Sequence, residues 1–598
     1  MALRSTFAGF ETAKSGLFMS QKQLDITTHN MANVNTVGYT RQRYVTQAID
    51  PYGYLNRLAP VGNGNLIGMG VEPMSLDQLR DMFLDTQFRQ EHSTQGELDV
   101  RNQGMYYIED IFNNLGDYNM ESLIGKFFDS FSELASKGPN DPEYRTIVRS
   151  QAELLVSQFH TMYSQLEELQ TNYDNNIATV VQQINSIAYK IDALNDAIFK
   201  FELSDDKALD LRDQRNLLMD ELSGLIDFEY EEDNRGRVTI YVPDRASTLG
   251  NTGGKELVFP RSKTSPNKGY NVLIATNNLA KEPYTAGLYD PADYSNYKAL
   301  DGSPLNNVIW AVFDKDPNAL PDPGTVPGVT VNFNEGKLKG YFDVINGAGV
   351  LTAGIQGSDT RGVPYYIEQL NKLAQSLAIE INLVHMEGYT KDTDSDPAVS
   401  TSERFINFFN IPGWPDASDT TNATFYPGGP GTFDETAYRA AIAALDYSQI
   451  TAKNFDISDK IKESINNIAA SSKQVEMVAD GSLQTGNNET ALEILKLFDM
   501  EKLPNELKTG VGNFKNYYKS TVADLAVEVD RVNSLYKIQK ELVGSIDYQR
   551  AAISSVSQDE ETANLVMFQH AYNAAARCLT TLDEALDKLI NGTGRVGL

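Results

Sequence analysis

Apolar residues recur at every third or fourth position along one long stretch in the first half of the chain. Steps of three and four place such side chains on one face of an α-helix. From residue 159 to residue 198 the helix would form a rod of about 60 Å, at about 1.5 Å per residue. We therefore predict a long helix of the coiled-coil type within a bundle. Its apolar positions are Phe159, Met162, Leu166, Leu169, Tyr173, Ile177, Val180, Ile184, Ile187, Ile191, Leu194 and Ile198.

Two further segments repeat this spacing, one between Ile367 and Val384 and the other between Leu525 and Ile546. Helices with matching apolar faces can bury one another, so these faces need no external ligand. The three segments together predict an intrachain helical bundle.

Each end of the chain carries an apolar seam of its own. Near the N-terminus large apolar residues stand seven apart, and near the C-terminus they alternate in steps of three and four. Both patterns are typical of a helix that packs against another helix. We predict that the first helix pairs with the last and that the two seams form an assembly interface. Its residues are Leu3, Phe10, Leu17, Leu24, Met31, Leu565, Phe568, Tyr572, Leu579, Leu582, Leu586 and Leu589.

The last helix also has recognisable start and stop signals. Ser557 and Glu560 match a capping box, and the acidic residues 559–561 suit the positive end of the helix dipole. Lys588 lies near the expected end, and Gly592 follows it.

The middle of the chain has a different composition. Sixteen of the 22 prolines lie between Pro243 and Pro430, and proline is excluded from helix interiors. The residues 237–242 alternate and are β-branched, as in a strand, and 284–298 and 321–333 are broken by Pro, Gly and Asn as hairpins are. Trp310 and Trp414 lie in these regions, where we expect them to fill cores.

The predicted fold class is mainly α with inserted β-rich domains: paired terminal helices, a long-helix bundle and outward β or irregular insertions. Residues 1–55 and 545–598 form a terminal coiled-coil domain. The bundle comprises 56–235, 336–388 and 451–544. A β-rich outer insert covers 236–335, and a second irregular or β outer insert covers 389–450.

The charge of the chain argues against one class of partner. It has 51 Lys and Arg against 81 Asp and Glu, a net charge of −30, which repels a nucleic-acid backbone. The single cysteine, Cys578, excludes an intramolecular disulfide framework. No apolar run is long enough for a membrane span, and no cleavable secretory signal is readable, so we expect no membrane insertion.

Motifs for catalysis or metal binding are weak. The glycine-rich residues 61–68 lack the spacing of a phosphate loop and read as a turn between strands. Residues 392–403 follow the order of an EF-hand calcium loop, but Pro397 stands where that loop needs glycine, so we interpret them as an acidic surface loop. The five histidines are scattered singly. We therefore predict no enzyme, no cofactor and no metal site.

A resemblance is carried by the segment after the first helix. Residues 32–42, Ala-Asn-Val-Asn-Thr-Val-Gly-Tyr-Thr-Arg-Gln, resemble the signature of the bacterial flagellar rod, hook and hook-associated axial proteins. Similar blocks follow in the family's order at 79–85, 211–223, 336–343 and 556–572. The long helical region 159–223, with its Asp-Gln-Arg motif, favours the hook-associated members. The motif residues are Asn33, Asn35, Thr36, Gly38 and Tyr39, and Val37 stands where many relatives have proline.

This resemblance implies a structural adapter that assembles at the junction of hook and filament. Its terminal helices would form the inner tube, and its middle domains would face outward. The implied partners are copies of itself in a tube or ring, the hook protein and the next hook-associated protein toward the filament. The family is exported through the flagellar type III apparatus, which implies an extracellular location on the flagellum.

Before export we expect a dedicated chaperone to hold the C-terminal helix, because a bare apolar seam would invite premature assembly. Two alternatives remain open at this point. The outward inserts would suit an adhesin or glycan-binding surface, and the chain could be another axial subunit of the hook or rod.

Overall fold

The computed structural model describes most of the chain. The described residues are 8–49, 70–113, 119–203, 206–242, 255–261, 269–276, 307–310, 330–391 without 351, 353, 354 and 356, 403–473 without 416, 418, 420, 428 and 430–432, 487–500 and 514–592. Within them the structure is mainly helical with small antiparallel sheets, which confirms the predicted fold class.

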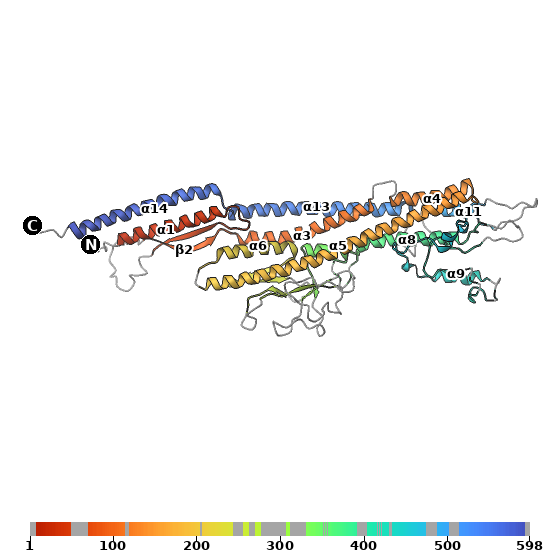
Figure 1. Cartoon of the computed structure of the whole chain (residues 1–598), viewed down its shortest axis with the longest axis horizontal. Helices are drawn as coiled ribbons and strands as arrows, with labels where there is room; N and C mark the ends of the chain where they lie inside the picture. Colours follow the sequence, from red (N-terminus) through yellow and green to blue (C-terminus); the bar gives the residue numbers. More distant parts are fainter. Residues whose placement is uncertain are drawn as a thin grey trace, which may run out of the picture.

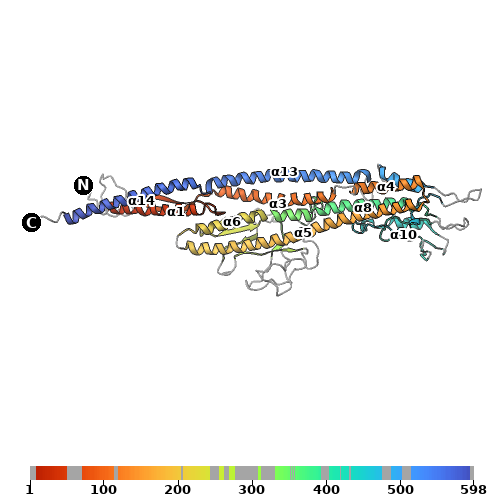
Figure 2. The same ribbon diagram turned by 45° about the horizontal axis from the view of Figure 1, so that its top comes forward.

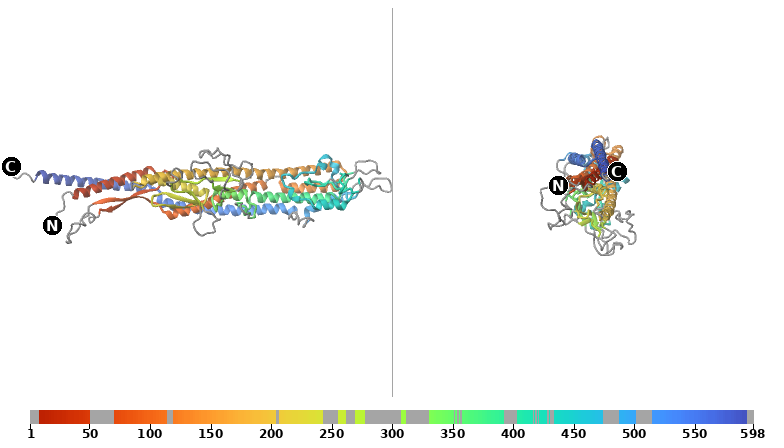
Figure 3. Two further views of the ribbon diagram at one scale, coloured as in Figure 1. Left: turned by 90° about the horizontal axis from the view of Figure 1, so that it is seen from below. Right: turned by 90° about the vertical axis from the view of Figure 1, so that its left-hand side faces the viewer.

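The molecule is long and narrow (Figure 1, Figure 3). Both termini lie at one end, beside the helices α1 (Ala8–Ala32) and α14 (Gln558–Asp587). The central part is a bundle of long helices, and smaller elements gather at the opposite end (Figure 2). The helices of the bundle and of the far end are α3 (Met82–Phe112), α4 (Met120–Lys137), α5 (Pro142–Glu202), α6 (Leu209–Leu225), α7 (Lys337–Ile345), α8 (Val363–His385), α9 (Glu435–Ala443), α10 (Asp459–Glu463), α11 (Glu489–Asp499) and α13 (Phe514–Ser554).

The helix α5 is the axis of the bundle. It begins at Asp141, whose side chain accepts a hydrogen bond from the Glu143 backbone, and Pro142 occupies the first turn, where its missing N–H is not needed. Its 61 residues correspond to a length of about 90 Å. Eleven of the twelve apolar positions predicted for this helix are buried; Leu194 is partly exposed. The predicted long helix is therefore confirmed, and it extends beyond the periodic stretch at both ends.

Three short sheets complete the described fold. One is the hairpin β1 (Gln42–Ala48) and β2 (Val71–Gln78), which packs on α1. A second has β3 (Glu229–Glu232), β4 (Val238–Val242) and β5 (Lys255–Val258), and the third has β6 (Leu273–Thr276), β7 (Asn307–Trp310) and β8 (Thr330–Val331). Every pairing is antiparallel. The strand expected at 237–242 is confirmed as β4.

Buried amides join the last two sheets to α5. Asn195 donates to the Val238 carbonyl over 2.8 Å and accepts from the Val238 N–H over 3.1 Å. Asn185 makes the same pair of bonds to Leu273, each of 2.9 Å. Each side-chain amide donates one hydrogen bond to the strand backbone and accepts one from it, as a neighbouring strand would. The first insert is therefore packed along α5, and Trp310 fills the same core, with 3% of its surface exposed.

The second insert is held to α8 by a buried histidine. The Nδ1 atom of His385 lies 2.7 Å from the Ile406 carbonyl, and its Nε2 atom accepts the Ala469 N–H over 2.8 Å. A carbonyl can only accept and an N–H can only donate, so the proton is on Nδ1 and the ring is neutral. Burial lowers the pKa of His385 to about 4. Among the described residues of 389–450 there is the helix α9 but no strand.

Two of the expected domain boundaries differ from the structure. The helix α13 continues without a break through position 545 to Ser554, so the chain leaves the bundle at 555–557. The hairpin β1–β2 packs on α1 and extends the terminal unit past residue 55 to Gln78. Residues 50–69, 284–298 and 392–402, for which we expected turns and an acidic loop, lie outside the described residues.

Candidate assembly interface

The terminal helices α1 and α14 lie side by side, as the two seams predict (Figure 1). Near the free end of the pair, a Cβ atom on Gly9 would lie 3.5 Å from a methyl carbon of Leu582. The helices therefore approach closely where α1 carries a glycine.

The pairing leaves the seam residues incompletely buried. In α14 only Glu561 is fully buried. Phe18, Met567 and Ile590 are more than half exposed. An amphipathic helix in a finished bundle normally buries its apolar stripe. The half-buried seam residues are Phe10, Leu17, Leu24, Met31, Leu565, Phe568, Tyr572, Leu579, Leu582 and Leu586.

Two predicted interface residues differ from this group. Leu589 is 54% exposed and lies in the single π-helical turn Lys588–Gly592 that follows α14. Leu3 lies outside the described residues. The two seams therefore pack against each other over most of their length, and Leu589, the last seam residue, lies on the surface.

The motif after α1 forms a tight turn. Asn33 donates from its side chain to the His29 carbonyl over 3.0 Å, and its side-chain oxygen accepts from Thr36 over 3.1 Å. Gly38 has a φ of 80°, and a Cβ atom there would lie 3.2 Å from Leu217. Glycine suits this position because a side chain would be strained and crowded against α6. The side chain of Asn35 is exposed.

Beyond the turn, the chain bonds to a buried asparagine of α1. The Tyr39 hydroxyl donates to Asn30 Oδ1 over 2.7 Å, and the Gln42 N–H donates to the same oxygen over 3.1 Å. The Asn30 amide donates to the Gln42 carbonyl over 3.0 Å and to Glu561 over 3.3 Å. Burial, together with nearby Asp210 and Asp213, raises the pKa of Tyr39, so its hydroxyl stays protonated and able to donate.

The same segment docks on α6. The Thr40 N–H donates to Asp213 over 3.0 Å, and the Gln42 side chain donates to Asp210 over 2.7 Å. Burial raises the pKa of Asp213 to about 6, although Thr40 and Arg80 partly offset this effect. Sequence blocks 32–42 and 211–223 therefore meet directly.

Arg41 connects this segment to the start of α14. Its guanidinium lies 2.7 Å from Glu561, which is only 2% exposed, and 2.7 Å from Glu560. Ser557 caps α14 by accepting from the Glu560 N–H. The start signal is confirmed, but the Glu560 carboxylate bonds to Arg41 where a full capping box would have it bond back to the Ser557 backbone.

A further group of charges joins α3, α6 and α13. Arg550 donates to Asp85 over 2.9 Å and to Asp220 over 2.6 Å, and Arg89 donates to Asp220 over 2.7 Å. Arg80 pairs with the other oxygen of Asp85. Burial raises the pKa of Asp220, but Arg89 and Arg550 outweigh this effect, so the pKa is lower than usual and the carboxylate stays charged.

We call this set of contacts the motif cluster. It brings together four of the five blocks that carry the resemblance, at the point where the terminal pair joins the bundle. The sequence identified these blocks, but it did not predict that they are in contact in the folded chain. Its members are Asn30, Tyr39, Thr40, Arg41, Gln42, Arg80, Asp85, Arg89, Asp210, Asp213, Asp220, Arg550, Glu560 and Glu561.

The fifth block, 336–343, packs elsewhere on α3. Gly340 lies against the backbone of Glu97, and Asp343 pairs with Lys339 and with Arg101 at 3.7 Å. Burial raises the pKa of Asp343, more than these two cations lower it. Across the part of the chain that the structure describes, no group of three His, Cys, Asp or Glu could hold a metal ion.

Two family models of flagellar proteins match parts of this chain. Residues 105–287 match the family model described as the flagellar hook-associated protein FlgK helical domain, and 10–40 match that of flagella basal body rod proteins. The flagellar hook-associated protein 1 of Bacillus subtilis is 27% identical over 99% of this chain and 99% of its own length.

The chain is thus similar over nearly its whole length to flagellar hook-associated protein 1. The Escherichia coli member is 24% identical over 97% of this chain and 98% of its own length. The solved structure of the flagellar hook junction protein FlgK from Burkholderia pseudomallei aligns with 79% of this chain and 100% of its own, at 14% identity and a TM-score of 0.49. The rod-protein match covers most of α1 and the motif turn. None of the described helices is both long and apolar enough for a membrane span.

Proposed function

We propose that this chain is a structural adapter subunit of the bacterial flagellum, assembled at the hook–filament junction, where it connects hook to filament. The observation that carries the proposal is the incompletely buried α1–α14 pair, in a chain that aligns over its whole length with hook-associated protein 1. Its relatives are structural proteins, and we propose no catalytic role and no cofactor.

The pair supports assembly with further copies of the chain. Two helices can cover only one stripe of each other, and the exposed apolar residues need neighbours to bury them. The seam residues are thus the proposed interface, with the terminal domain in the inner tube and the inserts outward. The other proposed partners are the hook protein and the next hook-associated protein toward the filament.

The motif cluster supports the same function by fixing how the pair leaves the bundle. A tube requires each subunit to present its terminal helices at the same angle. Charge-assisted hydrogen bonds such as that of Gln42 to Asp210 of α6, 2.7 Å long, are directional, so they restrict that angle. We assign the motif residues Asn33, Asn35, Thr36, Gly38 and Tyr39 to this joint.

We further propose export through the flagellar type III apparatus to an extracellular position, with a chaperone on α14 before export. The chaperone would cover the face of Leu565, Phe568 and Tyr572, which α1 leaves partly exposed. The alternatives are an adhesin and another axial subunit. Relatives that match over the full length favour the hook-associated role over hook or rod subunits.

The test introduces one aspartate on either face of α14. Leu582→Asp places a charge against Gly9 of α1, within the seam. Thr580→Asp places the same charge on an exposed position of the same helix. Each variant is expressed in a flagellated strain that lacks its own hook-associated protein 1.

Leu582→Asp is expected to abolish swimming and junction assembly, because neighbouring copies would complete the burial of this half-buried position and an unpaired buried carboxylate costs several kcal/mol. Thr580→Asp is expected to swim. Circular dichroism of both purified proteins should show the same helical content. Normal junctions with Leu582→Asp would exclude this seam as the interface.

A further inference from the structure

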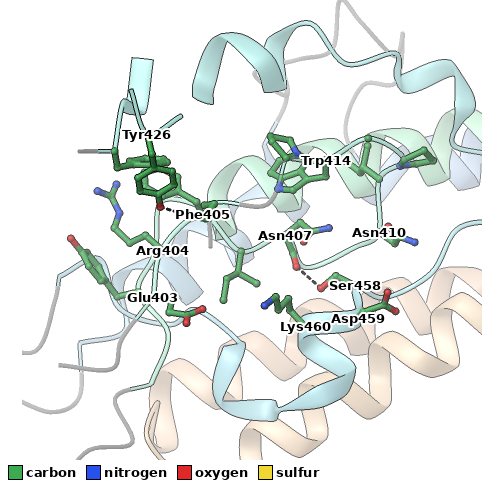
Figure 4. Close-up of a pocket in the computed structure, with 18 residues that line it drawn as sticks. Glu403, Arg404, Phe405, Asn407, Asn410, Trp414, Tyr426, Ser458, Asp459 and Lys460 are labelled. Carbon is green, nitrogen blue, oxygen red and sulfur yellow. Dashed lines mark hydrogen bonds between the residues drawn. The ribbon is translucent and has the colours of Figure 1, made fainter. Parts of the chain in front are cut away.

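A cavity of about 600 Å³ lies in the second insert (Figure 4), which with α9 is at the end of the molecule opposite the terminal pair (Figure 1). Its wall comes from the segments 403–417 and 458–460 and from single residues around them. Cavities of roughly 300–1,000 Å³ with apolar walls and a few polar groups are typical of small-molecule sites. The assembly role described above makes no use of it.

Aromatic rings form much of the cavity wall. Phe405 packs on Phe433, with ring centroids 4.9 Å apart, and Tyr426 packs on Phe433 at 5.4 Å. Trp414 contacts both the main hydrophobic core and the small separate core around Tyr438. The cavity therefore lies at the boundary between these two hydrophobic cores, where their side chains do not fill the space.

The backbone beside these rings is strained. Phe405 has a φ of 68°, the one positive value outside glycine in the described chain. Its N–H donates to the Met386 carbonyl over 3.1 Å, and its carbonyl accepts from the Tyr438 hydroxyl over 3.2 Å. Such a conformation is unfavourable and persists where the surroundings hold it, which is common at binding sites.

Two buried donors in the wall lack an acceptor among the described residues. They are the indole Nε1 of Trp414 and the Nε of Arg404. Arg404 donates from Nη2 to Glu387 over 3.2 Å. An unpaired buried donor is unfavourable, so a ligand that offered an acceptor to either group would be stabilised.

The polar groups around the cavity carry no excess charge. The lining holds two acidic residues, Glu403 and Asp459, and two basic residues, Arg404 and Lys460, so their formal charges cancel, and Asn410 adds an exposed amide (Figure 4). A nucleotide or another strong anion would need a surplus of cations. The balance favours a neutral ligand that both donates and accepts hydrogen bonds.

We propose that this cavity binds a short neutral saccharide. Hydroxyl groups of a sugar both donate and accept, which suits the mixed amide, carboxylate and ammonium rim. The C–H face of a pyranose ring can pack on the Trp414 and Tyr426 rings, and its oxygens can accept from the indole N–H. This proposal gives a structural subunit a ligand-binding site, and it does not depend on the proposed role at the junction.

The chain offers a direct reporter because it has two tryptophans. Trp310→Phe, in the other insert, leaves Trp414 as the sole source of tryptophan emission. Full-length Trp310→Phe protein is titrated with triacetylchitotriose and with cellotriose, and with decaproline as a peptide probe. We expect saturable quenching or a spectral shift of Trp414 with at least one of the two sugars and none with the peptide.

Variants of the wall then locate the site by saturation-transfer NMR of the bound sugar, which needs no tryptophan. Trp414→Ala is expected to weaken binding at least about tenfold, and Trp414→Phe, which keeps a ring but loses the N–H, about threefold to tenfold. Trp310→Phe is the matched control and should bind as the natural chain does. The Trp414→Phe result remains informative if Trp414→Ala fails to fold.

Three outcomes would overturn the proposal. The first is no response to either sugar at 10 mM, a concentration of the order of the weakest binding that such sites show. The second is equal affinity in the Trp414 variants and the control. The third is binding of decaproline alone, which would make the cavity a peptide site.

Discussion

Asn30 joins three chain segments, α1, the residues 39–42 and α14, through one side chain. Its oxygen accepts from Tyr39 and from the backbone of Gln42, and its nitrogen donates to Gln42 and to Glu561. Both amide atoms are thus fully used in a site that is 1% exposed. Removing such a side chain leaves several buried groups unpaired, each costing about 1–3 kcal/mol.

Asp213→Asn is expected to stabilise the protein at neutral pH. Burial raises the pKa of Asp213 to about 6 from 3.8, so between these values the folded state keeps a proton that the unfolded chain releases. The contribution of this group to the free energy of unfolding therefore falls as the pH rises through that window and stays unfavourable above it. The asparagine oxygen can still accept from Thr40.

Urea unfolding of the natural chain and the variant, from pH 4 to pH 8, checks this expectation. The variant's advantage should be small at pH 4 and grow to about 3 kcal/mol by pH 7. A difference that does not change with pH would mean that Asp213 titrates normally.

The residues of the motif turn were easier to predict from the sequence than the buried polar residues that bond to the segment after it. Gly38 belongs to a recognisable motif, and its positive φ explains why glycine stands there. Nothing in the spacing singles out Asn30 or Asp213, because their role arises when α6, β1 and α14 arrive from distant parts of the sequence. Polar partners of this kind are set by tertiary structure.

Among the elements, α14 depends most on one neighbour. Apart from the motif cluster at its start, its described contacts are with α1 and with the turn that follows it. The cores of α5 and the strands do not include it. A chain ending at residue 557 should therefore keep its bundle and lose assembly.

The measurement compares chains ending at 557 and at 592. Both should unfold thermally within a few degrees of each other, and trypsin should remove α1 rapidly from the shorter chain alone, because unpartnered terminal segments are poorly ordered. Loss of the bundle's cooperative transition in the shorter chain would show that α14 supports the whole fold.

The spacing of apolar residues predicted where the helices lie, but it did not predict the residues at which they begin and end. Leu525 to Ile546 indicated a helix, whereas α13 runs from Phe514 to Ser554, since the bundle supports polar turns at both ends. The strand pairs were harder still. Asn185 and Asn195 read as polar interruptions of a helix, and they are the residues that attach two sheets to it.

For the whole molecule, length is the property most easily measured. The helices α13 and α14 follow each other nearly in line, and their 41 and 30 residues give about 107 Å of helix (Figure 3). A compact domain of this chain length would have a radius of gyration of about 25 Å. Small-angle X-ray scattering of the monomer should give at least about 30 Å, and a value near 25 Å would mean that the terminal pair folds back on the bundle.

The candidate sites differ in how far the sequence pointed to them. The seams were visible because Leu565 and its successors repeat at helical spacing. The cavity beside Trp414 was not, since its wall comes from several irregular segments that no period connects. Core filling describes Trp310 well, while Trp414 is half buried and lines an open space.

The joint between the terminal pair and the bundle also has a mechanical consequence. In the described chain the backbone crosses it at two short linkers, 79–81 and 555–557. A torque that enters through α1 and α14 would be carried by both linkers and, in parallel, by the bonds of Thr40 to Asp213 and of Gln42 to Asp210. Two covalent crossings with hydrogen bonds between them resist twisting of the terminal pair against the bundle, so a subunit of this design would pass rotation from one part to the other.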